Sequence, residues 1–343
     1  MGDLNNMHLN VAALTGGANV PSSRFRWQQY VKDIEDAGIS CKELTAKFGS
    51  YAPSGTVKRV YWFLGASFNG VFRAIQSRKY DVVFLQRNLI ATLKTAEYLL
   101  RDPYILDVDD AIFVSQRFGC VDKIAKKARV IVCGNNYLAE YFARFSRVEI
   151  VPTAVDTTRF VPCINGNADA PVIGWSGSSS GFSYLYSIEK ALSRVLDMFP
   201  DAVIKIVADK APVFSILPSS RVVFQKWTPD SEVAAVQSFS VGLMPLHDSP
   251  WARGKCSYKM LTYMACGVPC VVSPVGMNVD ILGKGCCGLS AVSHDDWVDA
   301  IAYIINSGSV ADQMGAMGKF IVDNNYSRKI VSPEIIRIIR SSV

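Results

Sequence analysis

Three basic side chains, Arg253, Lys255 and Lys259, surround a glycine where a helix is predicted to begin. The apolar spacing of residues 254–270 predicts that Lys255 and Lys259 lie one turn apart, opposite the apolar face. A helix N-terminus carries about half a positive charge, so cations there are unfavourable unless an anion binds. A diphosphate would bond both the free N–H groups and the lysines. We therefore expect a diphosphate site; lysines that extend from a surface helix into solvent are the alternative.

The rest of the sequence predicts parallel α/β layers that would position these residues. Short apolar runs alternate with helix-period stretches along the whole chain, which is typical of such folds. Strands are predicted near residues 8–14, 81–86, 103–107, 129–133, 148–151, 172–175, 202–207, 221–224, 240–244 and 268–273. Helices are predicted near residues 22–37, 57–77, 89–101, 118–127 and 135–145. Ser293 and Asp296 predict a capping box for a later helix.

The length of 343 residues suits two domains of roughly 150 residues each. We expect a Rossmann-like first domain over residues 1–155, a linker over 156–170, a Rossmann-like second domain over 171–322 and a helical tail over 323–343. Two doubly wound domains of this kind are expected to face a central cleft, with the tail helix returning to the first domain. The fingerprint G-x-G-x-x-G is absent after the first strand, which argues against a dehydrogenase.

Composition limits the class of protein further. Half of the residues are hydrophobic and 19% are charged, so the chain is globular rather than disordered. No apolar run approaches the roughly 18 residues that span a bilayer, and the first ten residues lack the features of a signal peptide. The nine cysteines include no C-x-x-C pair, as in proteins of reducing compartments. We expect a cytoplasmic protein, attached peripherally to the inner membrane face if it binds a membrane.

The positive charge is concentrated in the first half of the chain. The net charge is +6, and residues 1–160 hold 21 Lys and Arg against 15 Asp and Glu. Between Glu43 and Asp81 there is no acidic residue. Such a local positive field favours an anionic partner. A solvated basic face is the alternative.

The predicted helix over residues 57–77 has two contrasting faces. An apolar stripe, predicted to pack on the first domain, contains Leu64, Phe68, Val71, Phe72 and Ile75. Another side carries Lys58, Trp62, Asn69 and Arg73. We expect that side to be a basic outer surface, suited to an anionic membrane. A basic helix with Trp62 in the core is the alternative.

The segment SYKMLTYMACGVPCVVSPVGMNVDIL resembles the signature of the family 4 glycosyltransferases, which are retaining enzymes of the two-Rossmann GT-B architecture. Other stretches match that family in order: SSRFRWQQYV, ILDVDDAIF, VIVCGNNYLAEYF, VEIVPTAVDTTRF and VIGWSGSSS. The similarity is tight over residues 147–283 and looser before them. It implies a nucleotide-sugar held mainly by the second domain and an acceptor held by the basic first domain.

The family's layout implies roles for individual residues. The donor diphosphate is expected at Gly17, Gly177, Ser178, Arg253, Lys255 and Lys259. The nucleoside is expected beside Lys226, Trp227 and Thr262, where an indole face could stack on the base; an ordinary half-buried tryptophan is the alternative. The donor sugar or the acceptor is expected near Gly16, Arg24, His247, Asp248, Gly254, Cys256 and Ser257. His247 is read as a loop residue rather than as a catalytic base.

One departure from the family pattern concerns the donor sugar. The usual motif has two glutamates eight positions apart, and here those positions are Gly254 and Thr262. Thr262 can still offer a hydroxyl to a ribose, whereas Gly254 has no side chain for a sugar. Three outcomes stay open: Asp248 or backbone groups take over, sugar selection differs, or activity is lost.

The sequence Asp107-Val108-Asp109-Asp110 contains a D-x-D motif. In the other glycosyltransferase architecture this motif holds Mn²⁺ or Mg²⁺. Here the basic helix end already supplies counter-charge, so we expect neither a metal nor another cofactor. The resemblance implies that Asp109, Asp110 and Lys255 are the catalytic group, with the carboxylates bonded to sugar or acceptor hydroxyls. A turn capped by Asp110 is the alternative.

These observations predict a retaining, hexosyltransferase-like enzyme of polysaccharide biosynthesis. It would move a sugar from UDP or GDP to a glycan, a lipid-linked acceptor or another anionic acceptor, by positioning and electrostatic stabilisation. A catalytically weakened nucleotide-binding scaffold and a sugar-nucleotide epimerase of the same fold are the alternatives. The expected partners are the nucleotide-sugar, the acceptor and an anionic membrane surface, with no nucleic acid.

Overall fold

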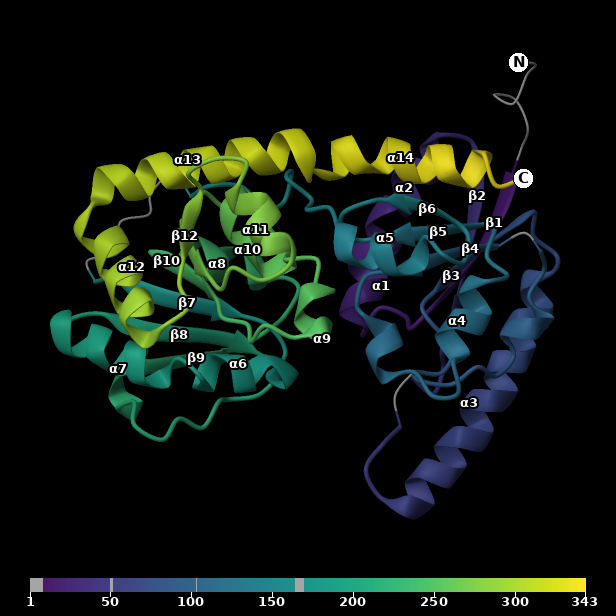
Figure 1. Cartoon of the computed structure of the whole chain (residues 1–343), viewed down its shortest axis with the longest axis horizontal. Helices are drawn as coiled ribbons and strands as arrows, with labels where there is room; N and C mark the ends of the chain where they lie inside the picture. The colour runs from purple at the N-terminus through teal and green to yellow at the C-terminus, as the bar shows by residue number, and fades with distance from the viewer. Residues whose placement is uncertain (1–8, 50–51, 103, 164–169) are drawn as a thin grey trace. The chain divides into compact units, whose positions relative to one another are not determined.

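The computed structural model describes residues 9–49, 52–102, 104–163 and 170–343. Residues 164–169 of the predicted linker, and the predicted strand residues 8 and 103, lie outside the described residues. The chain forms two compact units (Figure 1). Unit 1 comprises Met1–Ala154, Arg253–Cys256 and Arg328–Val343, and unit 2 comprises Val155–Ala252 and Ser257–Ser327.

Unit 1 contains a parallel sheet of six strands in the order β2-β1-β3-β4-β5-β6. The strands are β1 (Leu9–Thr15), β2 (Ile39–Thr45), β3 (Val82–Gln86), β4 (Tyr104–Val108), β5 (Val130–Cys133) and β6 (Arg147–Ile150). Strands β3, β4 and β5 are buried along their whole length, as their uninterrupted apolar sequences predict for strands covered on both faces. The strand order reverses between β1 and β3. Such a switch point is where α/β sheets usually bind ligands.

The helices of unit 1 are α1 (Pro21–Arg26), α2 (Val31–Asp36), α3 (Thr56–Ser77), α4 (Cys120–Ala125), α5 (Asn136–Phe142) and α14 (Arg328–Arg340). Helix α14 contacts α2, and its apolar face joins the buried core around Trp27 and Phe84. A guanidinium nitrogen of Arg340 donates to the Ala37 carbonyl at 2.8 Å. The return of the tail helix to the first domain is therefore confirmed.

Unit 2 contains a second parallel sheet of six strands, in the order β12-β11-β10-β7-β8-β9. The strands are β7 (Val172–Ser176), β8 (Val203–Ala208), β9 (Val222–Lys226), β10 (Val241–Met244), β11 (Cys270–Val272) and β12 (Gly288–Ser290). The order reverses between β7 and β10, which places the switch point of this unit at their carboxyl ends. The sequence patterns predicted neither β12 nor β2 of unit 1.

The helices around the second sheet are α6 (Phe182–Tyr186), α7 (Glu189–Met198), α8 (Glu232–Gln237), α9 (Pro250–Arg253), α10 (Tyr258–Ala265), α11 (Met277–Leu282), α12 (His294–Asn306) and α13 (Gly308–Asn325). The predicted capping box is present: the Ser293 side chain accepts from the backbone of Asp296, whose carboxylate accepts from the backbone of Ser293. Trp175 and Trp297 are buried in the core of this unit. The predicted α/β class with two Rossmann-like domains is confirmed.

Helix α3 lies where it was predicted, but the prediction of which face packs inward was wrong. Asn69 and Arg73 are buried, while the apolar stripe is exposed: Leu64, Phe68, Val71, Phe72 and Ile75. The guanidinium of Arg73 donates to the carbonyls of Leu44 and Thr15, each at 2.8 Å. These carbonyls lie at the ends of β2 and β1, and their bonds to Arg73 satisfy the buried guanidinium, whose N–H groups would be costly to leave unbonded. The polar face therefore packs on the sheet.

The helix predicted over residues 89–101 is absent, and only a 3-10 turn forms at Glu97–Leu99. The buried carboxylate of Glu97 accepts hydrogen bonds from the backbone N–H groups of Leu89 at 2.9 Å and Thr95 at 2.5 Å. A side chain that bonds backbone donors in this way competes with helix formation. The segment consequently folds as a loop.

Candidate functional site

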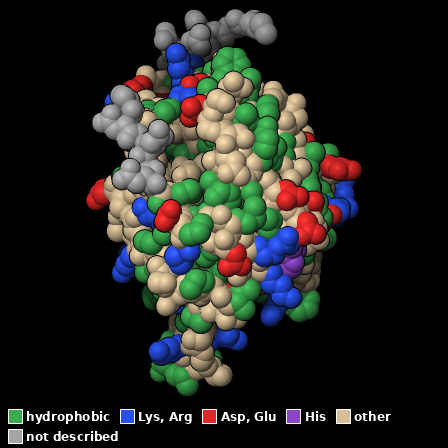
Figure 2. All heavy atoms as spheres, turned by 90° about the vertical axis from the view of Figure 1, so that its left-hand side faces the viewer, with side chains coloured by type: hydrophobic (Ala, Val, Ile, Leu, Met, Phe, Trp, Pro, Cys, Tyr) green, Lys and Arg blue, Asp and Glu red, His purple; other side chains and the backbone are tan. Residues whose placement is uncertain are grey.

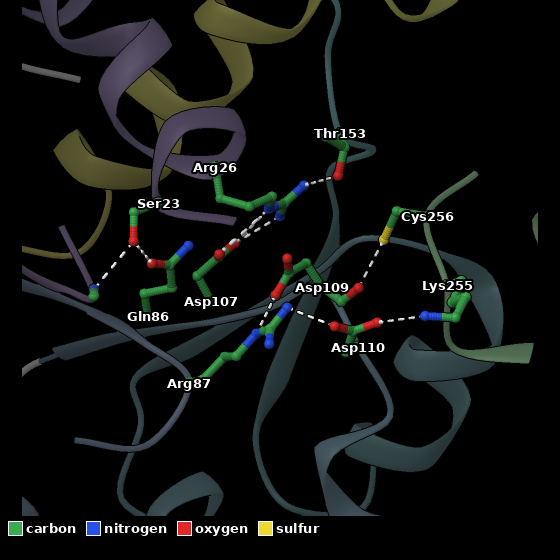
Figure 3. Close-up of polar contacts among 11 residues, drawn as sticks. Ser23, Arg26, Gln86, Arg87, Asp107, Asp109, Asp110, Thr153, Lys255 and Cys256 are labelled. Carbon is green, nitrogen blue, oxygen red and sulfur yellow. Dashed lines mark hydrogen bonds and ion pairs between the residues drawn. The ribbon is translucent and has the colours of Figure 1, made fainter. Parts of the chain in front are cut away.

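Asp107, the first acid of the D-x-D motif, is a structural residue of unit 1 (Figure 3). It lies in β4 with no exposure and accepts from Arg26 Nη2 at 2.6 Å and Arg26 Nε at 3.1 Å. Arg26 Nη1 also donates to the Val151 carbonyl at 2.7 Å. Burial alone would lower the pKa of Arg26, but the charge of Asp107 outweighs it and raises that pKa. The pair is a buried ion pair that joins α1 to the sheet.

Asp109 and Asp110 follow β4 and share one arginine, Arg87, which follows β3 (Figure 3). Arg87 Nε lies 2.5 Å from Asp109 Oδ1, and Arg87 Nη2 lies 2.6 Å from Asp110 Oδ2. Burial raises the pKa of Asp110. Burial also acts on Asp109, but the charge of Arg87 outweighs it and lowers that pKa. Among the described residues, no three His, Cys, Asp or Glu side chains are grouped as metal ligands.

The segment of residues 253–256 packs within unit 1 beside these acids. Asn135 Nδ2 donates to the carbonyls of Arg253 at 3.2 Å and Lys255 at 3.0 Å. Lys255 Nζ lies 3.9 Å from a carboxylate oxygen of Asp110. Cys256 Sγ donates to the backbone carbonyl that follows β4 at 3.2 Å (Figure 3). The structure thus brings the predicted catalytic group together, through Lys255 and Asp110.

The prediction that Lys255 and Lys259 lie one turn apart on a single helix is wrong. Helix α10 begins at Tyr258, and Ser257 before it has a left-handed backbone with φ of 51°. Arg253 is the last residue of the separate helix α9. The left-handed residue interrupts the helix, so Lys255 lies in a loop of unit 1 and Lys259 lies in a helix of unit 2.

The surroundings of Gly254, where the sequence resemblance led us to expect a glutamate, leave no space for a side chain. A Cβ at this position would lie 2.6 Å from Ala111 Cβ and 2.7 Å from the backbone nitrogen of Ala111. The latter neighbour is backbone, so it cannot turn aside as a flexible side chain would. The glycine therefore fits a close approach of two chain segments.

Gly16, Gly17 and Arg24 lie at or near the carboxyl end of β1. The N–H of Gly16 donates to Ser23 Oγ at 3.0 Å. Gly17 has φ of 86°, a conformation that favours glycine. Arg24 Nη1 donates to the carbonyl of Ala18 at 2.9 Å. These contacts fold the loop onto itself at the switch point of unit 1.

In unit 2, Lys259 crosses the end of β7 at Gly177. A Cβ on Gly177 would overlap Lys259 Cε, so the glycine makes room for the lysine chain. Lys259 Nζ lies 5.4 Å from the centroid of a Trp175 ring, within the range of a cation–π contact. Ser178 is exposed, and its Oγ lies 2.7 Å from Ser180 Oγ. A positive charge and a glycine turn therefore meet at the switch point of this unit.

An acidic residue, Asp209, closes the same loop from the end of β8. Its carboxylate accepts from the N–H of Ser179 at 2.6 Å and from Ser179 Oγ at 2.8 Å. Burial alone would raise the pKa of Asp209, but these hydrogen bonds outweigh it and lower that pKa. The Ser179 N–H is therefore already bonded to a carboxylate.

Two hydroxyl groups predicted to bind ligand are bonded to protein groups. Thr262 is buried, and its hydroxyl donates to the carbonyl of Lys259 at 2.8 Å. Ser257 is also buried, and its hydroxyl donates to Asn278 Oδ1 at 2.7 Å. The Thr262 hydroxyl therefore already donates its proton within the protein, and toward a ribose it could act only as an acceptor.

The remaining predicted residues lie at strand ends of unit 2. Lys226 is exposed at the end of β9, and Trp227 after it is half-buried. His247 and Asp248 are exposed in the loop that follows β10. The ring of His247 lies edge-on to that of Tyr184, with centroids 5.3 Å apart.

Several residues of these clusters were not singled out from the sequence: Arg26, Arg87, Asn135, Trp175, Asp209 and Tyr184. Arg87 directly follows a predicted strand, and polar residues at the carboxyl ends of parallel strands gather at one edge of the sheet. That rule applies equally to Asp209 after β8. Nothing in the sequence pattern pairs Arg26 with Asp107.

Comparisons with known proteins agree with this architecture. Residues 170–307, less than half of the chain, match the family model of glycosyl transferases group 1. A comparison with curated protein sequences finds no match. Sucrose-phosphate synthase from Thermosynechococcus elongatus has a similar structure, with a TM-score of 0.72 at 14% identity, covering 97% of this chain and 98% of that one.

Two further solved structures extend the likeness. A UDP-forming α,α-trehalose-phosphate synthase from Burkholderia vietnamiensis gives a TM-score of 0.69 at 11% identity. The match covers 97% of this chain and 100% of that one. HepE of Anabaena, solved with UDP and glucose, gives 0.68 at 13% identity, with coverage of 97% and 100%. At such identities the likeness establishes the fold alone. The chain thus has the GT-B fold, and the sequence match within its second unit supports a glycosyltransferase.

Proposed function

We propose that this chain is a retaining glycosyltransferase that takes a sugar from a nucleoside-diphosphate sugar held by unit 2. The observation that carries the proposal is Lys259, which crosses Gly177 at the switch point of a Rossmann-like unit and lies over Trp175. All three residues fall within the segment that matches glycosyl transferases group 1. A lysine at this edge can bond a diphosphate as a charged donor.

Under this proposal a basic side chain neutralises the diphosphate, as Mn²⁺ or Mg²⁺ does in the other glycosyltransferase architecture. Lys259 would stabilise the leaving diphosphate without a divalent ion. Trp227, half-buried after β9, would stack on the base, with Lys226 beside it. Activity that survives EDTA would agree with this assignment, whereas loss in EDTA and recovery with Mn²⁺ would contradict it.

Unit 1 would supply the acceptor side of the reaction. Asp109 and Asp110 are held by Arg87. The lowered pKa of Asp109 keeps its carboxylate ionised, so it could accept from a sugar or acceptor hydroxyl. Lys255 lies beside Asp110. Because no carboxylate is assigned as a nucleophile, catalysis would come from positioning and charge. The acceptor would be a glycan or a lipid-linked sugar.

Uridine is the first nucleoside to test, since HepE of Anabaena was solved with UDP and with UDP-glucose. Titration calorimetry would compare UDP and uridine on the parent, Lys259→Ala and a control, Lys190→Ala, at an exposed position of α7. A charged hydrogen bond is worth about 1.5–3 kcal/mol, so Lys259→Ala should weaken UDP binding roughly ten- to a hundredfold. Uridine binding should change little.

The reaction itself is tested by release of nucleoside diphosphate from UDP, GDP and ADP sugars, with and without candidate acceptors. Product NMR then reports the anomeric configuration, and an inverted product would refute the retaining mechanism. If Lys259→Ala binds UDP as tightly as the parent and the control Lys190→Ala do, the proposed donor site is refuted.

A nucleotide-binding scaffold is the second candidate, favoured by the packing of Gly254 on Ala111. The position of the family's sugar-binding glutamate is closed by backbone there. Tight UDP binding with no release from any donor would support the scaffold over the transferase. Interconversion of sugars without release would indicate an epimerase.

A further inference from the structure

The outer face of α3 is a continuous apolar surface on unit 1. Helix α3 has 22 residues, and one stripe of its exposed side chains contains Val57, Val60, Tyr61, Leu64, Phe68, Val71, Phe72 and Ile75. These positions repeat every three or four residues and cover about 120° of an ideal helix. Phe68 and Tyr61 are 78% and 74% exposed. We call these eight side chains the α3 stripe.

The orientation of α3 is fixed by its opposite face, so the stripe cannot turn inward. Arg73 and Asn69 are buried on that face, together with Ala66, Ala74 and Ser77. Arg73 donates to two carbonyls of the sheet, and Asn69 Oδ1 accepts from the N–H of Lys47 at 3.2 Å. Rotating the helix would break these bonds and leave a charge buried without partners.

The charged residues of the segment that contains the stripe are all positive. Residues 44–80 include no Asp or Glu. The exposed cations in this range are Lys47, Lys58, Arg59, Arg78 and Lys79. Lys58 and Arg59 lie in the first turns of α3. At the lower tip of the view in Figure 2, hydrophobic side chains and Lys or Arg side chains are seen together. Phe48, 52% exposed, adds an aromatic ring next to Lys47.

This combination fits one occupant better than the others. An apolar stripe flanked by cations is the pattern of a helix that lies in the plane of a membrane interface. A second copy of this face would instead bring like charges together with no carboxylate to pair them. Within the described part of the chain, no helix is long and apolar enough to cross a bilayer.

We propose that the α3 stripe docks unit 1 on an anionic bilayer surface, with its aromatic and aliphatic side chains inserted at the headgroup level. Lys58 bonds lipid phosphates beside the inserted face, and Arg59, on the next side of the same turn, adds positive charge near the surface. Of the basic side expected to make this contact, Asn69 and Arg73 are buried whereas Lys58 is exposed, so the attachment is primarily apolar and secondarily electrostatic. This inference stands without the proposed sugar transfer, and its test uses no catalytic readout.

The experiment is sedimentation of the full chain with vesicles of phosphatidylcholine alone or with 30% phosphatidylglycerol. Phe68→Asp with Phe72→Asp removes the apolar contact, and the control Phe320→Asp changes a phenylalanine of α13 that is 63% exposed. Lys58→Glu with Arg59→Glu removes the charge contact. Its control, Lys190→Glu with Lys210→Glu, changes exposed lysines of unit 2 and gives the same net charge.

The parent should bind anionic vesicles, and less so in 0.5 M salt because exposed charges are screened. Loss of the two cations should lower the partition coefficient about fivefold for each charge, and the phenylalanine pair should lower it by at least about tenfold. Both controls should bind like the parent. Circular dichroism and a cooperative thermal transition confirm that each variant is folded.

Three results would overturn the proposal. One is absence of parent binding to any vesicle. Another is binding by the phenylalanine variant that equals that of Phe320→Asp. The third is a parent that is dimeric by analytical ultracentrifugation while the phenylalanine variant is monomeric, which would assign the α3 stripe to a second copy of the chain.

Discussion

Adding one methyl group at Gly254 should destabilise unit 1. The new Cβ would lie 2.6 Å from Ala111 Cβ and 2.7 Å from the Ala111 nitrogen, both inside ordinary contact distance. Overpacking of this kind typically costs about 1–3 kcal/mol. At roughly 2–4 °C per kcal/mol for a unit of this size, Gly254→Ala should melt several degrees below the parent in differential scanning calorimetry.

A second glycine provides the control for backbone effects. Gly308 is the first residue of α13, and a Cβ there would meet nothing within 4 Å. Since glycine is a poor helix former, Gly308→Ala should be neutral or more stable than the parent by up to about 1 kcal/mol. If Gly254→Ala melts as high as Gly308→Ala, the close approach to Ala111 is not a real constraint.

The double variant identifies which neighbour matters. Ala111→Gly removes the Cβ–Cβ overlap but leaves the backbone nitrogen in place, so Gly254→Ala in that background should recover only part of the lost stability. Gly254→Glu should be less stable than Gly254→Ala and should not gain donor hydrolysis. A stable Gly254→Glu variant with faster turnover would refute both the packing argument and its bearing on function.

Three further predictions concern charges and thiols. Asp107→Asn should cost about 3–5 kcal/mol in chemical denaturation because it strands the buried Arg26, whereas Asp295→Asn, from an exposed pair with Arg194, should cost at most about 1 kcal/mol. The pKa of Asp109 is lowered in the folded state, so its stabilising effect is present above its ordinary pKa and is lost as the pH falls through the folded value. The stability difference between the parent and Asp109→Asn should therefore shrink on acidification below about pH 4. Iodoacetamide should label the native protein first at the two exposed thiols, Cys163 and Cys286, and slowly at Cys256, since burial raises the pKa of Cys256 to about 12; rapid labelling of Cys256 by mass spectrometry would contradict its burial.

The alternation of apolar runs and helix-period stretches was sufficient to predict the fold, because parallel strands buried on both faces require that pattern. Periodicity located α3 to within one residue but did not determine its orientation. The apolar stripe is the usual inward face, yet in this fold Arg73 on the other face is buried and bonded to the carbonyls of Thr15 and Leu44. Hydrogen bonds between residues far apart in the sequence cannot be recognised from its periodicity.

The candidate site was predictable only in part for a similar reason. Spacing treated Lys255 and Lys259 as a pair on one helix, whereas the left-handed backbone of Ser257 separates them. Beside this break, Asn135 bonds the carbonyl of Lys255 from 120 residues away in the sequence, a contact that spacing does not reveal. The glycine loop and the acids after β4 were found because strand ends are visible in the pattern.

Unit 1 is built from segments far apart in the sequence, and this affects the order in which the units can fold during synthesis. Its buried core includes Val331, Ile335, Ile338 and Ile339, which leave the ribosome after the whole of unit 2. The nascent first 154 residues would therefore carry an uncovered apolar groove beside α2 until translation of α14. Unit 2, whose segments lie within Val155–Ser327, can close first although it is made second. A fragment that lacks α14 should consequently aggregate or recruit chaperones. A circular permutant in which α14 precedes β1 should fold sooner.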